Sequence, residues 1–402
     1  MELFKNINVD WMGKVWLFLS ASLILLVVGW FSVLQHGGFT YSIDFTGGTL
    51  IKVKTAQKPD VDRLRDALKQ SLGAADVTRF DAEEKNLVQI RMKKIESEDS
   101  ASFQNLGQNI YDALHGILDK AKVQGKQDLN RVGIDQLAAT LSESRVLENM
   151  GRLTAGATIE ETQRVYRELA ETIVNHRTDR GGLITDIGQL GSLPGISNPV
   201  LGVLKQHYYP GSFTVLSVDS VGPKIGKELQ DKATKAVFFS LLGMLVYIAL
   251  RFKFAFGVGA VIALFHDVLI TMGLMSLLGK EISLIVVAGF LTLVGYSIND
   301  TIVVFDRIRE NIKLNRADTF RTIINKSINQ TLSRTVITSG LTFISVFCLW
   351  LLGGETLDGF SFVLVIGIII GTYSSIVVAS PLTYLWMRYL GTAKEKKVYK
   401  FA

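Results

Sequence analysis

Six apolar runs constrain the fold of this 402-residue chain more than any other feature. They cover residues 15–34, 234–250, 254–279, 282–305, 332–352 and 360–387. A helix needs about 20 apolar residues to cross the roughly 30 Å hydrocarbon core of a bilayer. Because the backbone must satisfy its own hydrogen bonds there, each run is expected to be a transmembrane helix. The first run follows Lys5 and Lys14 as in a signal peptide, but its length and the lack of a small-residue cleavage site favour an uncleaved anchor.

Composition divides the chain between membrane and water. Hydrophobic residues make up 48% of it and charged residues 20%, with a net charge of +6. The charged fraction requires a sizeable part outside the bilayer. Lys and Arg lie mostly at the ends of the apolar runs, so the basic balance does not indicate nucleic acid. Cys348 is the single cysteine, which excludes an intrachain disulfide.

The basic residues also predict the orientation. They concentrate in residues 1–14, 251–253, 306–331 and 388–402, whereas the turns on the opposite side hold only Lys280 as a basic residue. Basic short loops favour the cytoplasm. Both termini are therefore expected to be cytoplasmic, and residues 35–233 to lie outside.

The long polar segment between the first and second spans predicts an α+β domain. Residues 49–55, 87–92 and 213–218 alternate like strands, and residues 61–72 repeat apolar positions at helical spacing. This order is typical of a split βαβ, ferredoxin-like sandwich. Residues 95–210 are mostly helical in pattern and are expected to be an insertion. The predicted fold class is a polytopic α-helical membrane protein with six transmembrane helices and this enlarged external domain.

Two motifs resemble phosphate-binding elements without matching them. The hairpin at residues 193–197 (LPGIS) is similar to a helix-hairpin-helix turn, but Ile196 and Ser197 follow Gly195 where a second glycine is needed. A plain helical hairpin is favoured, with no nucleic-acid partner. Residues 222–228 (GPKIGKE) are one residue short of a phosphate loop and place Glu228 where a Ser or Thr would hold magnesium. No hydrolase or metal-site motif is present, so neither an enzyme nor a cofactor is expected.

Asp300 is the main functional candidate because it interrupts the apolar run that begins near residue 282. A carboxylate in hydrocarbon is retained mainly where it titrates, pairs or lines a path. Arg334 lies early in the next span, in the same half of the membrane, so the two side chains are expected to come close. Contact with a guanidinium favours the ionised carboxylate and apolar surroundings favour the neutral acid, so helix movement can switch between them. The alternative is a structural ion pair that fixes helix register.

Four ordered segments carry a resemblance to a known family. They are residues 42–48 (SIDFTGG), 220–229 (SVGPKIGKEL), 263–271 (ALFHDVLIT) and 295–311 (GYSINDTIVVFDRIREN). The chain resembles the SecF branch of the SecD/SecF family of protein-export membrane proteins, relatives of the resistance-nodulation-division transporters. Ser42 stands where a Gly is usual, and the insertion is longer than is usual. The matching motif positions are Asp44, Phe45, Thr46, Gly47, Gly48, Gly222, Pro223, Gly295, Asn299, Asp306 and Arg307.

The resemblance implies a function in protein export across the bacterial inner membrane. It implies a SecD-like partner subunit, H⁺ as the coupling ion, and contact with the SecYEG translocon, associated insertion factors and the exported polypeptide. Asp300 and Arg334 match the proton-pathway residues of the family. His266 and Asp267 are adjacent in the third span; they either extend a proton relay or make a polar contact with the SecD half. Gly47, Gly48, Gly222 and Pro223 are expected to shape the chain between membrane and external domain.

Two other functions remain open. One is a half-size proton-coupled exporter of lipid or small molecules, and the other is a non-transporting assembly scaffold in which Asp300 and Arg334 merely pair.

Overall fold

The computed structural model describes residues 8–72, 75–80, 86–92, 100–119, 125–151, 153, 158–315 and 317–391. The chain divides into two compact units. The α+β unit is Gly47–Lys224, and the helical unit comprises the residues before Gly47 and after Lys224.

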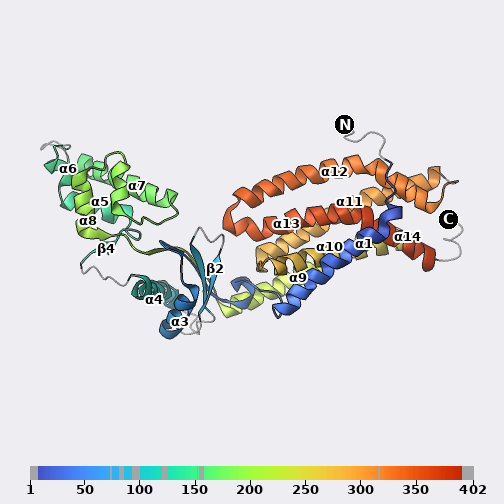
Figure 1. The fold of residues 1–402 in the computed structure, drawn as a ribbon, viewed down its shortest axis with the longest axis horizontal. Coiled ribbons are helices and arrows are strands. Elements are labelled where there is room, and N and C mark those ends of the chain that lie inside the picture. The colour runs from blue at the N-terminus through green and yellow to red at the C-terminus, as the bar shows by residue number, and fades with distance from the viewer. Residues whose placement is uncertain are drawn as a thin grey trace. The chain divides into compact units, whose positions relative to one another are not determined.

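Within the described residues, the helical unit contains six helices long and apolar enough to cross a membrane (Figure 1). The first five are α1 (Val15–Gln35), α9 (Pro223–Arg251), α10 (Phe254–Leu277), α11 (Leu284–Leu314) and α12 (Phe320–Leu352). The sixth is formed by α13 (Gly354–Ser374), the π-helical turn η4 (Ser375–Ala379) and α14 (Ser380–Tyr389), which are continuous. A 3₁₀ turn, η1 (Met12–Lys14), precedes α1. The predicted fold class of a six-span membrane protein with a sheet-containing domain is confirmed.

Apart from α10, the helices are longer than the apolar runs that predicted them. Helix α9 starts at Pro223, whereas its apolar run starts at residue 234, and α11 and α12 extend through much of the basic segment 306–331. Helical hydrogen bonding continues past the last apolar residue as long as the ends are capped. The Thr319 side chain, for example, accepts a hydrogen bond from the Thr322 amide at the start of α12. The predicted bounds therefore mark only the apolar part of each helix.

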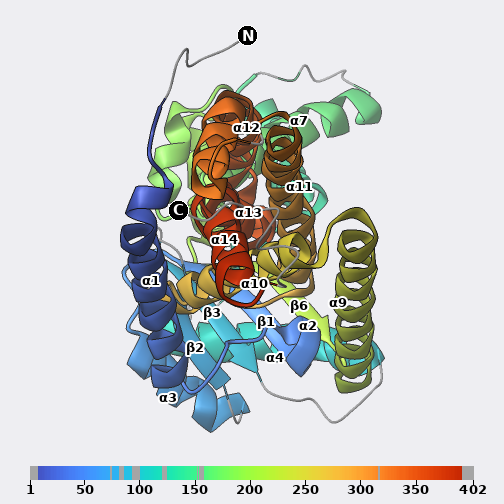
Figure 2. The ribbon, with the colours of Figure 1, turned by 90° about the vertical axis from the view of Figure 1, so that its right-hand side faces the viewer.

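Glycines bring the helices into close contact. A Cβ on Gly29 of α1 would lie 2.8 Å from the Cα of Gly273 on α10, so the two backbones touch. Gly367 of α13 makes room for the side chain of Leu293 on α11, so this contact lies within the chain. Helix α9 packs least: it stands apart from α1 across the bundle (Figure 2), and Gly226, Ala233 and Ile248 are its buried residues.

The α+β unit is built on a four-stranded antiparallel sheet of order β2-β3-β1-β6. Its elements are β1 (Gly48–Thr55), α3 (Val61–Leu72), β2 (Ala75–Phe80), β3 (Leu87–Met92), α4 (Ser100–Leu118) and β6 (Phe213–Val221). Strand β3 lies between β1 and β2, which gives the predicted split βαβ arrangement. The side chains of Ile51, Ile90 and Leu68 meet in its core.

Two features of this unit differ from the sequence prediction. Strand β2 was not predicted, because it is short; its Ala75 and Val77 enter the core. Helix α4 was assigned to the insertion at 95–210, but its Ile110 and Leu114 pack against the sheet. An amphipathic pattern shows that a helix buries one face and does not show which partner covers it. The separate helical part therefore begins after α4.

That helical insertion has its own core. It contains β4 (Gln127–Asp128), α5 (Ile134–Glu143), α6 (Val146–Asn149), α7 (Ile159–Asp179), the 3₁₀ helix η3 (Ile187–Ser192), α8 (Asn198–His207) and β5 (Tyr208–Tyr209). Tyr166, Leu137 and Leu204 are among its buried residues. Ile196 of the hairpin at residues 193–197 is buried in the same core, as a plain helical hairpin requires.

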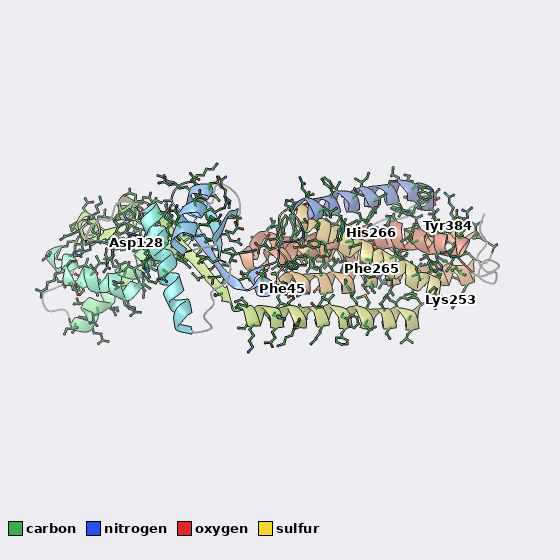
Figure 3. The ribbon with its side chains drawn as sticks, turned by 90° about the horizontal axis from the view of Figure 1, so that it is seen from below. Phe45, Asp128, Lys253, Phe265, His266 and Tyr384 are labelled. Carbon is green, nitrogen blue, oxygen red and sulfur yellow. The ribbon has the colours of Figure 1, made fainter. Side chains whose placement is uncertain are left out.

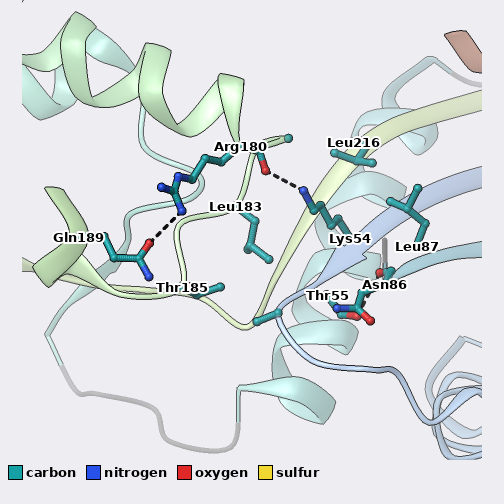
Figure 4. Close-up of a pocket in the computed structure, with 11 residues that line it drawn as sticks. Lys54, Thr55, Asn86, Leu87, Arg180, Leu183, Thr185, Gln189 and Leu216 are labelled. Carbon is teal, nitrogen blue, oxygen red and sulfur yellow. Dashed lines mark hydrogen bonds between the residues drawn. The ribbon is translucent and has the colours of Figure 1, made fainter. Parts of the chain in front are cut away.

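A pocket of about 520 Å³ lies where the insertion meets the end of β1 (Figure 4). The Lys54 amine donates a hydrogen bond to the carbonyl of Arg180 at 2.7 Å, and the Arg180 guanidinium donates to Gln189 at 3.4 Å. The Lys54 contact joins the insertion to the sheet, and the Arg180–Gln189 contact lies within the insertion.

Candidate functional site

Asp300 lies on α11 with 3% of its surface exposed. Its Oδ2 accepts a hydrogen bond of 2.9 Å from the hydroxyl of Ser339 on α12. The carboxyl has no ion pair within the described part of the chain. Ser339 is a partner that the sequence did not reveal, because a small hydroxyl residue in an apolar helix is common and usually bonds to its own backbone.

Arg334 lies on α12 near Asp300 but does not contact it. The guanidinium acts on the Asp300 carboxyl electrostatically, and the two form neither an ion pair nor a hydrogen bond. Arg334 is exposed on the helical unit, whereas Thr335 and Ser339 are buried on the side of α12 that faces inward. The structure therefore brings the predicted pair to neighbouring helices and leaves a gap between them.

His266 and Asp267 form a second buried polar cluster on α10. Asp267 is fully buried, its Oδ1 lies 2.9 Å from His266 Nδ1, and its Oδ2 accepts a hydrogen bond of 2.5 Å from Ser297 on α11. Figure 3 shows His266 between Phe45 at one end of the helical unit and Lys253 at the other. Ser297 precedes Asp300 by about one helical turn, so the two clusters share α11.

The first motif segment is fastened to the start of α11. Residues Ile43–Thr46 form the short helix α2. The Asp44 carboxylate accepts a hydrogen bond of 2.9 Å from the Leu284 amide, and the side chain of Phe45 packs in the apolar cluster around Ile282 and Val286. The Thr46 hydroxyl donates to the carbonyl of Ser42 at 3.1 Å. The segment thus caps the helix that carries Asp300.

The paired glycines make the turn into the sheet. Gly47 and Gly48 have φ angles of +67° and +115°, which side chains other than glycine rarely adopt. A Cβ on Gly47 would also lie 3.1 Å from the Cα of Pro223, the first residue of α9. Gly222 has free space around it, so its position imposes no such requirement.

The remaining motif residues occupy two places on α11. Gly295 and Asn299 are exposed on the membrane part of the helix. Further along, Asp306 forms an ion pair of 2.7 Å with Arg251 at the end of α9, and Arg307 donates to Gln330 at 2.7 Å. The structure keeps this ionic group separate from the buried Asp300 cluster.

Comparisons with known proteins cover the whole chain. A sequence model described as "Protein export membrane protein SecD/SecF, C-terminal" matches residues 201–389, and one described as "SecD/SecF GG Motif" matches residues 36–59. Protein translocase subunit SecF of Koribacter versatilis is 43% identical over 98% of this chain and 96% of its own length. The SecF subunit of Calditerrivibrio nitroreducens is 37% identical over 96% of each chain.

Solved structures agree with these relatives. The crystal structure of SecDF, a translocon-associated membrane protein from Thermus thermophilus, superposes with a TM-score of 0.61 and 30% identity. The match covers 95% of this chain and 39% of SecDF, so this chain spans less than half of that protein. A SecDF structure in a super-membrane-facing form gives a TM-score of 0.53 at 29% identity, covering 99% of this chain and 41% of that chain. The chain belongs to the SecF family of protein translocase subunits, which are multi-pass membrane proteins of protein export.

Proposed function

We propose that this subunit, together with a SecD-like subunit, uses proton flow across the bacterial inner membrane to assist export through the Sec translocon. The observation that carries the proposal is Asp300. Its carboxyl is buried in a membrane helix, it has a hydroxyl donor in Ser339, and a cation, Arg334, lies near without touching it. Buried acids of this kind mark ion paths in membrane proteins.

The arrangement around Asp300 supports two states. A protonated, neutral carboxyl is compatible with the Ser339 hydrogen bond and the apolar surroundings that it has in the structure. An ionised carboxylate is stabilised by an opposite charge, so loss of the proton would draw Arg334 toward Asp300 and shift α12 along α11. One charge moved across the membrane is worth about 2.3 kcal/mol per 100 mV. A few protons therefore supply enough energy to bias a movement of the helices.

The exposed face of α11 and α12 supports a partner subunit. Gly295, Asn299 and Arg334 are all exposed on the helical unit, and an Arg or Asn that faces lipid is costly. The Thermus thermophilus SecDF chain is much longer than its matched portion, which covers 39% of it. A separate SecD-like subunit would supply the remainder here and would cover this face. SecDF is described as translocon-associated, which supports the translocon as a further partner.

Membrane orientation follows from the same basic residues that the sequence shows. Arg251, Arg307 and Arg309 gather at the end of the helical unit where α9 ends, and Asp306 pairs with two of them. Basic residues favour the cytoplasmic side, which supports a cytoplasmic location for this end and for both termini in a bacterial inner membrane.

Two substitutions test the proposal in vesicles that contain the translocon, the SecD-like subunit and an exported polypeptide. Copurification comes first, because failure to associate with a SecD-like subunit contradicts the proposal directly. Export is then measured with and without a protonophore. In assembled complexes, Asp300→Asn and Arg334→Ala should lower the gradient-dependent rate by about a hundredfold or more, the effect expected for loss of proton transfer.

The matched control is Asp306→Asn, which makes the same chemical change on the same helix in an ion pair that is partly exposed. It should retain gradient-dependent export. Full gradient-dependent export by both Asp300→Asn and Arg334→Ala would leave only the scaffold function. Proton-dependent movement of lipid or a small molecule by the chain alone would favour the half-size exporter.

A further inference from the structure

The cluster of His266 and Asp267 engages both oxygens of a buried carboxyl group. Asp267 is fully buried, and both of its oxygens are engaged: Oδ1 by His266 Nδ1 at 2.9 Å and Oδ2 by the Ser297 hydroxyl at 2.5 Å. The Ser374 hydroxyl lies close to the same carboxylate. When Asp267 is ionised it only accepts hydrogen bonds, and the hydrogen between the two side chains then lies on His266 Nδ1.

The other ring nitrogen of His266 is open. Nε2 is buried and has no hydrogen-bond partner within the described residues, although buried polar atoms in proteins are nearly always paired. With a bare lone pair on Nε2, the cluster carries one negative charge. With a proton on Nε2, the imidazolium balances the Asp267 carboxylate and the cluster is neutral. Its charge therefore depends on this single atom.

We propose that His266 is a second proton-binding residue of the translocase and that Asp267 is the positioning residue that holds its ring. This inference rests on the proposed function, because the transmembrane gradient supplies the proton. The Nε2 lone pair takes up one proton to form the imidazolium, and release of that proton restores the neutral ring. The carboxylate keeps Nδ1 protonated in both states, as carboxylates do for other catalytic and metal-binding histidines.

The sequence left open whether His266 and Asp267 belong to a proton relay or contact the partner subunit. The packing around the cluster favours the relay. The Nε2 atom is covered by other atoms of this chain, so a partner side chain reaches it only if those atoms are displaced. Helix α13 closes the other side of the cluster: a Cβ on Gly371 would lie 3.2 Å from the Ser297 Cβ and 3.6 Å from Asp267 Oδ2. The site is internal to the helical unit.

Most titratable groups of the neighbouring elements lie toward the helix ends. Helix α1 has none, and η4 has none. Helix α13 has Glu355 and Asp358 at its start, the latter paired with Lys280, and Tyr373, whose hydroxyl is bonded to the Phe18 carbonyl.

Helix α14 contributes Tyr384 and Arg388, which bond to each other, and the terminal Tyr389. Helix α11 contributes Tyr296 and Asp300 next to Ser297, and its far end carries the charged residues Asp306, Arg307, Arg309, Glu310 and Lys313. Asp300 is therefore the acid of α11 nearest in sequence to Ser297, about one turn beyond it.

His266→Asn tests the role of Nε2 without removing the support for Asp267. The Asn side-chain nitrogen lies close to the position of Nδ1 and can donate to Asp267, but Asn has nothing at the position of Nε2. Assembly with the SecD-like subunit should be retained, and gradient-dependent export should fall at least about tenfold. A merely structural histidine would predict export at the wild-type rate in this variant.

A second measurement observes the proton itself. The other four histidines of the chain are replaced, and ¹⁵N resonances of His266 are followed in the assembled complex from about pH 5 to about pH 9. The expected result is an Nε2 signal that changes between bare and protonated while Nδ1 stays protonated. Asp267→Asn should abolish that pattern. An Nε2 signal that stays in one state across this pH range would overturn the proposal. If His266→Asn does not assemble, this measurement tests the proposal by itself.

Asp300→Asn in the same assay separates the two proposals. Loss of gradient-dependent export in Asp300→Asn together with a wild-type rate in His266→Asn would contradict the role of His266 and leave the proposed function standing. A wild-type rate in Asp300→Asn would contradict the proposed function itself.

Discussion

Buried carboxyl groups in the two units differ in the hydrogen bonds that they accept. In the α+β unit, Asp128 accepts hydrogen bonds from Tyr111 at 3.0 Å, from the Asn130 amide at 2.9 Å and from the Gly211 amide at 3.2 Å. In the helical unit, the hydroxyl of Ser339 is the hydrogen-bond donor to Asp300. One carboxyl is held by three fixed donors, and the other is held by a single side chain on a different helix.

The difference follows from what stabilises each unit. Burial of large apolar side chains drives folding in water, and Asp128 then fixes β4 to the segment before β6. Burial raises the pKa of Asp128, and its hydrogen bonds act in the opposite direction. Within a bilayer, helices associate through close packing and polar contacts rather than through hydrophobic burial. A carboxyl with an incomplete set of partners in that setting is free to change them, as a proton switch requires.

The largest effect on stability is expected from Asp128→Ala. This change leaves the amides of Asn130 and Gly211 and the hydroxyl of Tyr111 without their acceptor, which should destabilise the α+β unit by about 3 kcal/mol. Hydrogen exchange of the amides at residues 208–213 in the full chain measures the loss. Asp135→Ala is the control, because that carboxylate is 85% exposed and pairs only with Arg167 at the surface. Equal protection in the two variants would show that Asp128 does not hold the insertion.

In the helical unit, the corresponding change is Gly273→Leu. The Gly273 backbone touches Gly29, so a larger side chain must push α1 away from α10, at a cost of about 2 kcal/mol. Thermal unfolding of the chain in detergent measures this cost. Gly243→Leu on α9 is the control, because a Cβ there meets nothing within 4 Å. If both variants unfold at the same temperature, close backbone packing does not stabilise this unit.

The features that the sequence predicted well are those that a short segment determines by itself. The six spans follow from apolar length, the split βαβ from alternation, and the burial of Asp300 from its position in an apolar run. Strand β2 and the position of α4 depend on which distant surface covers them. The Ser339 and Ser297 contacts depend on how two helices are rotated about their axes. The sequence predicted that Arg334 approaches Asp300. For the same reason, it could not show that the Ser339 hydroxyl of α12 is the group that bonds to the carboxyl.

The two units also differ in how the N-terminus of a helix is capped. In the α+β unit, Thr158 and Glu161 form a capping box at the start of α7, with hydrogen bonds of 3.2 Å and 3.0 Å. In the helical unit, α11 has two caps from different segments: Ser283 accepts from the Val286 amide at 3.2 Å, and Asp44 accepts from the Leu284 amide at 2.9 Å. The helix that carries Asp300 is thus fastened twice.

The smallest effect is therefore expected from Ser283→Ala. Thr158→Ala removes the N-cap of α7 and should cost about 1 kcal/mol. Ser283→Ala should cost only about 0.3 kcal/mol, because Asp44 still satisfies one amide of the first turn and its negative charge favours the helix N-terminus. Unfolding free energies of Ser283→Ala, Asp44→Ala and the double variant form a cycle that isolates the coupling. The double variant should lose more than the sum of the single changes, since each cap compensates for the other. Additive losses would mean that the Asp44 segment and Ser283 act independently and that neither cap compensates for loss of the other.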